Sequence, residues 1–338
     1  MEEYFSEMKV EFKNTIAADY SNAQVCNEPL FLHVENKLKD MPEGVSCVAS
    51  PMAFCVEDEL ISEAYRSLEK HKRVIIGDDA EDLLVFEKNE GDRGGESVRI
   101  KRRSIKNGLD FFEESERVKM AVIYKHMESG VIFVSIDGVV ISPAAVIGRG
   151  TVIHPNTEIR GACIIGEKCE IGPSSVVSNS TVGDGCRVIS SHIYDSILEN
   201  SVSVGPFSHI KVKCRIASGT KLGAFVEVKN SNIAENTAAL HLTYIGDSDV
   251  GRDVNFGCGV ITCNYDGMNK YRTKIGDRVF IGCNTNLVAP VTLGDGSFTA
   301  AGSTITDDLP DGSLGIARSK QTTKEGWADR KRSEGKLK

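Results

Sequence analysis

The chain has 338 residues, a formal net charge of −8 and ten cysteines. The acidic balance excludes a general attraction to nucleic acid or to an acidic membrane surface, and no apolar run approaches the roughly 18 residues that a membrane-spanning helix needs. Since neither a signal-peptide pattern nor a C-x-x-C pair occurs, the cysteines are expected to be reduced thiols of a cytoplasmic protein.

The N-terminal part of the chain, residues 1–104, predicts a small α/β or α+β domain. Val56–Lys70 carries apolar residues at helical spacing, and Val74–Ile76 and Leu83–Phe86 have the composition of short strands. The charged, glycine-rich stretch Glu87–Glu96 predicts a loop.

Residues 105–138 are expected to link this domain to the remainder of the chain. Phe111–Ser129 has the pattern of a helix, and Gly130 is placed to end it, because glycine readily adopts the left-handed conformation that follows many helices.

Residues 139–310 repeat with a period of six. One aliphatic or small residue marks each repeat in three runs, which are Ile141, Ile147, Ile153, Ile159, Ile165, Ile171 and Val177; Leu198, Val204, Ile210, Ile216, Leu222 and Val228; and Ile275, Ile281, Leu287, Leu293, Thr299 and Ile305. Neither a helix nor a flat strand has this period, whereas a coil that turns a corner after each short strand does. The sequence therefore predicts a mainly β fold: a left-handed parallel β-helix of hexapeptide repeats, with about nine coils of eighteen residues.

Two segments depart from the repeat. The polar stretch at 262–274 contains an Asn-Tyr-Asp-Gly turn signal and is expected to project from a corner. Residues 311–338 form a charged C-terminal tail that holds the single tryptophan, Trp327.

His241 is the candidate catalytic residue, because it lies where the aliphatic register breaks and because histidine can transfer protons near neutral pH. The other histidines considered are His154, His192 and His209, and neither interval between them is a multiple of the expected coil length. Since no acidic partner is evident either, a zinc site, and with it a β-helix carbonic anhydrase, is disfavoured and no metal is expected.

Several long motifs occur in order along the β-helix. They are H-L-T-Y-I-G-D at 241–247, V-N-F-G-C-G-V-I-T-C-N-Y-D-G-M-N-K-Y-R-T at 254–273, I-G-C-N-T-N-L-V-A-P-V-T at 281–292 and K-E-G-W at 324–327. From about Ile105 to Trp327 the chain resembles the acetyltransferase half of the bacterial bifunctional glucosamine-1-phosphate acetyltransferase/N-acetylglucosamine-1-phosphate uridyltransferase. The resemblance implies acetyl transfer from acetyl-coenzyme A to glucosamine 1-phosphate, in the synthesis of UDP-N-acetylglucosamine and cell-envelope precursors, by a homotrimer with shared active sites.

The resemblance also implies a role for each matching residue. His241 matches the catalytic base and Glu227 an acid that supports it. The sugar phosphate would be held by Lys211, Lys229, Tyr244, Asn255 and Lys270. Asn264 and Tyr265 would line the place where amine and thioester meet, and Cys258, Cys283, Ala301 and Arg318 would contact coenzyme A, Cys258 through its backbone N–H. No metal is required for this reaction.

The chain departs from the family at two places. Lys211 stands where the family usually has arginine, which keeps the charge and loses the two-pronged hydrogen bonding of a guanidinium. Residues 1–104 lack the family's glycine-rich nucleotide loop, and the family's magnesium-binding asparagine falls on Lys106, one step from Asn107. Uridyltransferase activity is therefore expected to be absent. Two other functions stay open: an acetyltransferase for another amino sugar or sugar nucleotide, and a catalytically silent trimeric scaffold.

Overall fold

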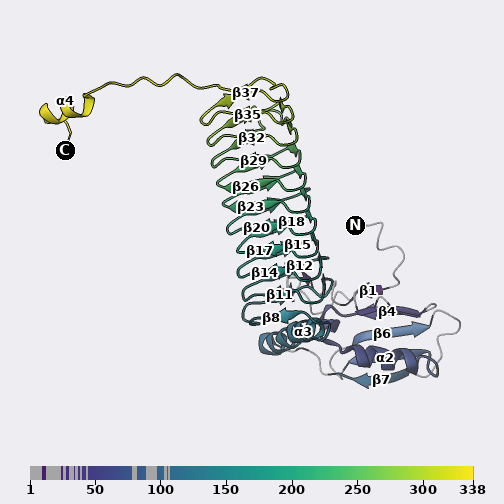
Figure 1. The fold of residues 1–338 in the computed structure, drawn as a ribbon. Helices are drawn as coiled ribbons and strands as arrows, with labels where there is room; N and C mark the ends of the chain where they lie inside the picture. The colour runs from purple at the N-terminus through teal and green to yellow at the C-terminus, as the bar shows by residue number, and fades with distance from the viewer. Residues whose placement is uncertain are drawn as a thin grey trace.

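The structure, a computed structural model, describes residues 10–12, 24–25, 28–29, 34, 37–38, 40–42, 45–77, 82–88, 97–102, 105 and 107–337. A long parallel β-helix stands on a small N-terminal domain, and the C-terminal tail leaves the far end of the β-helix (Figure 1). The predicted fold class is thereby confirmed.

The N-terminal domain is built on a mixed five-stranded sheet of order β1-β4-β6-β5-β7. Its elements are β1 Val10–Phe12, β4 Val45–Ala49, the 3₁₀ helix η1 Pro51–Cys55, α2 Asp58–Ser67, β5 Arg73–Gly77, β6 Asp82–Lys88 and β7 Ser97–Lys101, with a separate hairpin of β2 Gln24–Val25 and β3 Glu28–Pro29. The predicted helix and both predicted strands are confirmed. Of the predicted loop, Glu87 and Lys88 belong to β6, and 89–96 lie outside the described residues.

Helix α3, Gly108–Glu128, joins the two parts of the molecule. It begins because the Asn107 side chain accepts hydrogen bonds from the N–H groups of Leu109 and Asp110, at 2.9 and 3.1 Å. It ends before Gly130, whose φ of +94° suits glycine. The predicted helix is confirmed, beginning three residues earlier. Asn107 therefore acts as a helix cap, while Lys106 lies outside the described residues.

The sides of α3 belong to different cores. Val118 packs with the N-terminal domain, and Ile123 packs into the β-helix interior. The helix therefore covers the first apolar coil, which a repeat structure must protect from water at its ends.

The β-helix has three faces, each a parallel sheet. Face 1 consists of β8 Ile132–Phe133, β11 Val152–Ile153, β14 Glu170–Ile171, β17 Arg187–Val188, β20 Ser203–Val204, β23 Lys221–Ala224, β26 Ala238–His241, β29 Asn255–Phe256, β32 Phe280–Ile281, β35 Phe298–Thr299 and β37 Leu314–Gly315. Face 2 consists of β9 Val140–Ile141, β12 Glu158–Arg160, β15 Val176–Ser178, β18 His192–Tyr194, β21 His209–Lys211, β24 Glu227–Lys229, β27 Tyr244–Gly246, β30 Ile261–Cys263, β33 Asn286–Val288 and β36 Thr304–Ile305. Face 3 consists of β10 Val146–Ile147, β13 Ile164–Ile165, β16 Thr181–Val182, β19 Ile197–Leu198, β22 Arg215–Ile216, β25 Asn232–Ile233, β28 Ser248–Val250, β31 Thr273–Ile275 and β34 Val291–Leu293.

The interior of the β-helix is filled by the residues of the six-residue period. Every member of the three predicted runs is buried, and each stacks on its register partner in an adjacent coil, as Ile153 does on Ile171. Cys163, Cys169 and Cys186 lie in the same core as free thiols. The fold is stabilised by one inward residue per face in each coil, which is buried against the equivalent residues of the coils above and below.

The coils are not uniform in length, which corrects the expected constant length of eighteen. Register pairs on face 2 are Val176 with His192, His192 with His209 and His209 with Glu227, so these three successive coils contain 16, 17 and 18 residues. A constant coil length of eighteen would offset His192 from His209, but the observed register brings their rings together edge to face on face 2, with centroids 6.1 Å apart.

His154 has an acidic partner that the sequence analysis did not find. Its Nε2 lies 3.1 Å from Oε1 of Glu170, which is on the adjacent strand. In the described part of the chain, no group of three or more His, Cys, Asp or Glu side chains is placed to hold a metal ion.

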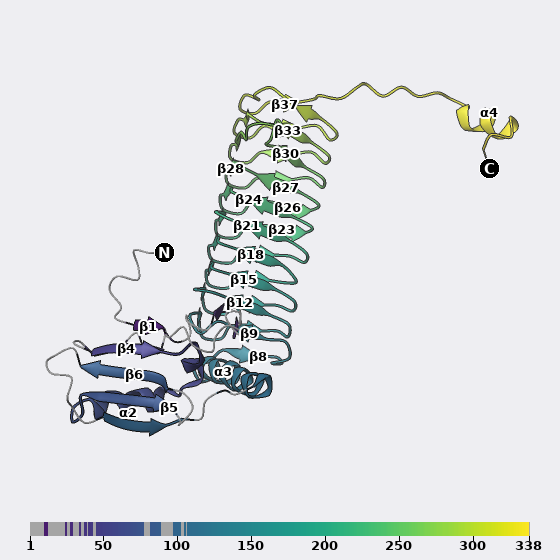
Figure 2. The same ribbon diagram turned by 180° about the vertical axis from the view of Figure 1, so that it is seen from behind.

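The C-terminal tail extends away from the last coil and ends in α4, Trp327–Ser333 (Figure 2). Trp327 is 47% exposed and no α4 residue is buried. None of the described helices is long and apolar enough to cross a membrane.

Candidate functional site

Five of the predicted site residues form a line along the corner between faces 1 and 2. The register pairs Ala239 with Phe256, Phe256 with Ile281, and Ile281 with Thr299. Two residues further along each coil, the corner carries in turn His241, Cys258, Cys283 and Ala301. Arg318 extends the line, because its Cδ would lie 3.8 Å from a Cβ added at Gly302, the neighbour of Ala301. We call this set the corner line.

His241 ends β26 and has an exposed side chain. Its position is set by the backbone: it pairs with Ala224 in the coil before, and Leu242 N–H donates to Ala224 O at 2.9 Å. Leu242 has a φ of +46°, a conformation that costs a bulky residue about 1–3 kcal/mol. The imidazole thus stands on a rigid corner and makes no side-chain hydrogen bond within the described residues.

Cys258 follows β29 at the same corner. A Cβ added at Gly257 would lie 2.5 Å from the backbone nitrogen of Cys283, so glycine is required for the coils to approach this closely. The backbone N–H of Cys258 has no acceptor among the described residues, and it is available to a ligand.

Face 2 carries the next group, beside His241. Lys211 and Lys229 are register partners on β21 and β24, and Glu227 is paired with Tyr244 on β27. Lys211 Nζ donates to Glu227 Oε1 at 2.9 Å, with both side chains about a third exposed. Glu227 makes no hydrogen bond to His241 in the described chain, so the predicted supporting acid is paired with Lys211 instead of the histidine.

Tyr244 lies on face 2 between Glu227, its register partner, and Asn264, which follows the next strand of that face. Its ring lies over Gly246, where an added Cβ would meet the hydroxyl at 2.4 Å. Burial raises the pKa of Tyr244, and a hydrogen bond with the Asn264 side chain opposes that shift. The phenol is therefore protonated at neutral pH and its O–H can donate a hydrogen bond.

Asn264 is buried at the corner between faces 2 and 3, at the root of the projecting segment. Its amide donates to Asp247, whose other carboxylate oxygen accepts from Asn230. Sequence reasoning missed both partners, although Asp247 is the last residue of the quoted H-L-T-Y-I-G-D motif. The buried carboxylate fixes which way the Asn264 amide points.

The segment at 265–271 projects from this corner, and every residue in it is exposed. It is shorter than the predicted projection at 262–274, because 262–263 belong to β30 and 273–274 to β31. Tyr265 and Lys270 form an antiparallel bridge across its base. Arg272 anchors the returning chain by donating to both carboxylate oxygens of Asp249, at 2.9 and 2.6 Å. This pairing holds the pKa of Asp249 below its usual range.

The predicted residues thus divide into three groups, and one stands apart. The corner line, the face 2 group around Tyr244 and the Asn264–Lys270 corner succeed one another around one side of the β-helix. Asn255 lies on the outer surface of face 1, between Ala238 and Phe280 in register. It shares the coil of Cys258 and lies three residues before it.

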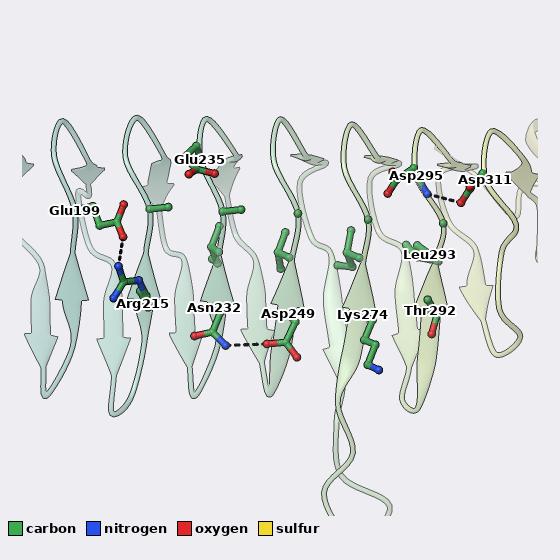
Figure 3. A pocket seen from close by; sticks show the side chains of 18 residues that line it. Glu199, Arg215, Asn232, Glu235, Asp249, Lys274, Thr292, Leu293, Asp295 and Asp311 are labelled. Atoms are coloured by element: carbon green, nitrogen blue, oxygen red, sulfur yellow. Dashed lines mark hydrogen bonds and ion pairs between the residues drawn. The ribbon is translucent and has the colours of Figure 1, made fainter.

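A groove of about 720 Å³ occupies a different part of the surface, on face 3 (Figure 3). None of the predicted site residues lines it. Two pairs of its polar side chains are bonded to each other: Arg215 with Glu199 at 2.6 Å and Asn232 with Asp249 at 2.8 Å. Because none of the candidate residues lies there, we do not assign the chemistry to this groove.

The chain is similar in sequence to known proteins over its β-helix. The family model described as bacterial transferase hexapeptide (six repeats) matches residues 272–307. The curated protein named Bifunctional protein GlmU from Caldanaerobacter subterraneus subsp. tengcongensis is 51% identical over 213 residues, which cover 63% of this chain and 47% of that protein. The protein of the same name from Clostridium botulinum (strain Langeland) is 41% identical over 252 residues, covering 74% and 55%. The chain spans about half the length of these relatives.

Among solved structures, the UDP-N-acetylglucosamine acyltransferase of Francisella novicida matches 55% of this chain and 67% of its own, with 16% identity and a TM-score of 0.27.

Proposed function

We propose that this chain, which is homologous to the bifunctional GlmU proteins over about two thirds of its length, transfers an acetyl group from acetyl-coenzyme A to the amine of glucosamine 1-phosphate. These relatives confirm the resemblance that the sequence motifs indicated. The observation that carries the proposal is the corner line, in which the expected base and the expected coenzyme A contacts succeed one another on five consecutive coils.

His241 would act as the general base. The substrate amine must lose a proton as its nitrogen attacks the thioester carbonyl, and an exposed imidazole can accept that proton near neutral pH. The free backbone N–H of Cys258, one coil away, would donate to the oxygen on which negative charge develops. The thiolate of coenzyme A then leaves and takes up a proton, so no covalent enzyme intermediate is needed.

The lysines of face 2 would bind the phosphate. Lys229 has no carboxylate partner among the described residues, whereas Lys211 already shares its charge with Glu227. Lys229 is therefore the better phosphate ligand of the two, and Lys270 on the projecting segment would add a second positive charge. Arg272 is excluded from this role because Asp249 occupies its guanidinium.

The proposal includes a homotrimer with shared sites. Within one chain, the strands of face 2 separate the corner line from the Asn264–Lys270 corner, and three strand residues span about 10 Å. A neighbouring chain that presents its Asn264–Lys270 corner to the corner line would close this gap, so that each site uses residues of two chains. Sedimentation that gives a fully active monomer at micromolar concentration would contradict it.

For the N-terminal domain we propose that no uridyltransferase activity is present. Asn107, the residue nearest to the family's magnesium ligand, uses its side-chain oxygen to cap α3. Pyrophosphate release from UTP and N-acetylglucosamine 1-phosphate with magnesium, above a blank without enzyme, would overturn this part of the proposal.

The test of the main proposal is a panel of amino sugars and their 1-phosphates, each offered with acetyl-coenzyme A while free thiol is measured. We expect glucosamine 1-phosphate to be the best substrate. If another amino sugar or a sugar nucleotide is the better substrate, the proposed acceptor is wrong and the proposed reaction, acetyl transfer, is retained. Thiol release no faster than the blank for every acceptor would favour the silent scaffold.

A further inference from the structure

We propose that Cys258 and Cys283 form a thiol pair that a small-molecule disulfide converts reversibly into an intramolecular disulfide. The consequence that we draw for activity rests on the proposed function, and the formation of the bond does not. The pair lies within the corner line, on two consecutive coils.

The first argument is proximity. Register pairing of Phe256 with Ile281 places Cys258 and Cys283 directly above one another, and Asn284 N–H donates to Cys258 O at 2.8 Å. Adjacent coils are spaced by about 4.8 Å, and the Cα atoms of a disulfide lie about 4.4–6.8 Å apart. The bond can therefore form without taking the two coils apart.

The second argument is access. Among the described free cysteines, Cys283 is exposed and Cys258 is partly buried, while six others lie in the protein interior. Cys263 is also partly buried, but it belongs to face 2, where its register partner is Val288. An exposed thiol next to a second thiol is the arrangement that thiol–disulfide exchange requires.

The chain contains a matched pair that lacks access. Cys169 and Cys186 are also neighbours on consecutive coils, because Glu170 pairs with Arg187. Their side chains are within hydrogen-bonding reach of one another, so stacked coils do bring two thiols into contact. Each is 1% exposed, so no reagent can reach them in the folded protein.

The reaction balances with a low-molecular-weight disulfide as oxidant. The Cys283 thiolate attacks one sulfur of the reagent, forming a mixed disulfide and releasing the first small thiol. The Cys258 thiolate then attacks the Cys283 sulfur and releases the second. The two protein thiols together lose two protons and two electrons, and the reagent is reduced to two thiols. Excess dithiol reverses both steps.

The disulfide would obstruct acetyl transfer. Both sulfurs lie where the proposed function places the thioester, between His241 and Ala301. Drawing the two side chains together alters the corner that offers the Cys258 N–H. We expect activity to fall by about tenfold or more, since displacing reacting groups by about 1 Å can cost up to about 100-fold.

The experiment uses the full chain, reduced and desalted, with oxidised glutathione as the probe. After quenching with N-ethylmaleimide, non-reducing peptide mass spectrometry should find Cys258 linked to Cys283. Cys169 and Cys186 should be alkylated only after denaturation. In Cys258→Ser, the reaction should stop at a glutathione adduct on Cys283. In Cys283→Ser, no link should form.

Any one of three results would contradict the proposed disulfide. Both thiols could stay free, a glutathione adduct on wild-type Cys283 could persist without a link to Cys258, or a non-reducing gel could show a link between two chains. Thiol release is measured on the same samples before oxidation, after it and after dithiothreitol. Linked protein that stays fully active would overturn the obstruction. If reduced protein shows no acetyl transfer, the proposed function fails, while the peptide mapping still decides whether the bond forms.

Discussion

Two corners of the same β-helix use the same repeat in opposite ways. At the corner between faces 3 and 1, carboxylate or amide side chains accept hydrogen bonds from backbone N–H groups of the preceding coil. Those that do so are Asp184, Asn200, Asp277, Asp295 and Asp311, at 2.8 or 2.9 Å. At the corner between faces 1 and 2, the side chains of the corner line make no such bonds within the described residues.

This difference separates stability from chemistry. Where side chains accept hydrogen bonds from the backbone of the same corner, those groups are not free to bind a ligand. Hydrogen bonds of this kind stabilise the turn in the way that a capping side chain stabilises a helix. A corner of glycine, alanine, cysteine and histidine leaves its side chains and at least the Cys258 N–H free. Substitutions at the two corners should therefore affect different measurements.

The largest expected effect is at His241. His241→Ala should lower kcat by about 10²–10⁴-fold, the usual contribution of a general base, and leave thermal unfolding unchanged, since the side chain is exposed. The matched control is His192→Ala, an exposed histidine on face 2 outside the proposed site. Steady-state thiol release measures both. A His241→Ala enzyme with kcat within about threefold of the parent would remove His241 from the chemistry.

The second effect concerns the phosphate. Lys229→Ala should raise the KM for glucosamine 1-phosphate by about 10–100-fold, because a hydrogen bond to a charged group contributes about 1.5–3 kcal/mol, and Lys270→Ala should raise it in the same direction. The KM for acetyl-coenzyme A should change little. Lys274→Ala, in the face 3 groove, is the control.

If unphosphorylated glucosamine is as good a substrate as its 1-phosphate, Lys229 and Lys270 do not bind a phosphate. In that case another amino sugar becomes the better acceptor.

The third effect should appear in stability alone. Asp277 Oδ1 accepts from Arg252 N–H at 2.8 Å, so Asp277→Ala should lower the free energy of unfolding by about 0.5–2 kcal/mol, as loss of a helix cap does. Denaturant unfolding measures this, and kcat/KM should be unchanged. Asp277→Asn should keep most of the stability, because Asn200 performs the same task for Asp184 N–H. A fall in kcat/KM for Asp277→Ala, with stability intact, would reverse the contrast between the corners.

The smallest effect is a pH dependence at the root of the projecting segment. Hydrogen bonds from Arg272 are the main cause that lowers the pKa of Asp249. The pair therefore stabilises the fold above the ordinary Asp pKa of about 3.9, and this contribution is lost as the pH falls through the lowered value. Both side chains are about 40% exposed, so the pair contributes about 0.2–1 kcal/mol.

Arg272→Gln should accordingly melt lower than the parent at pH 7, and the difference in Tm should shrink as the pH falls below about 4. A difference that grows on acidification would mean that another group sets the dependence.

Much of the fold could be read from the sequence because the core of a β-helix is local. One inward residue per face, repeated every six positions, decides the packing, and Ile141, Ile210 and Ile281 are buried as the period requires. The helix α3 was also predicted, with Gly130 marking its end, whereas its start at Gly108, where Asn107 caps it, lies three residues before the predicted one. The order of the N-terminal sheet was not, because its pairings join segments whose spacing carries no period.

The sequence by itself determined the repeat, the motifs and the identity of the candidate residues. Tertiary structure decided which of them stand together. His241, Cys258, Cys283 and Ala301 lie on one line although their intervals along the chain are unequal, because extra residues in a coil project as a loop while hydrogen bonding keeps the strands in register. It also decided that Asp247 orients Asn264 and that Glu227 pairs with Lys211. Such partnerships depend on side-chain positions in neighbouring coils, and no spacing in a single sequence records them.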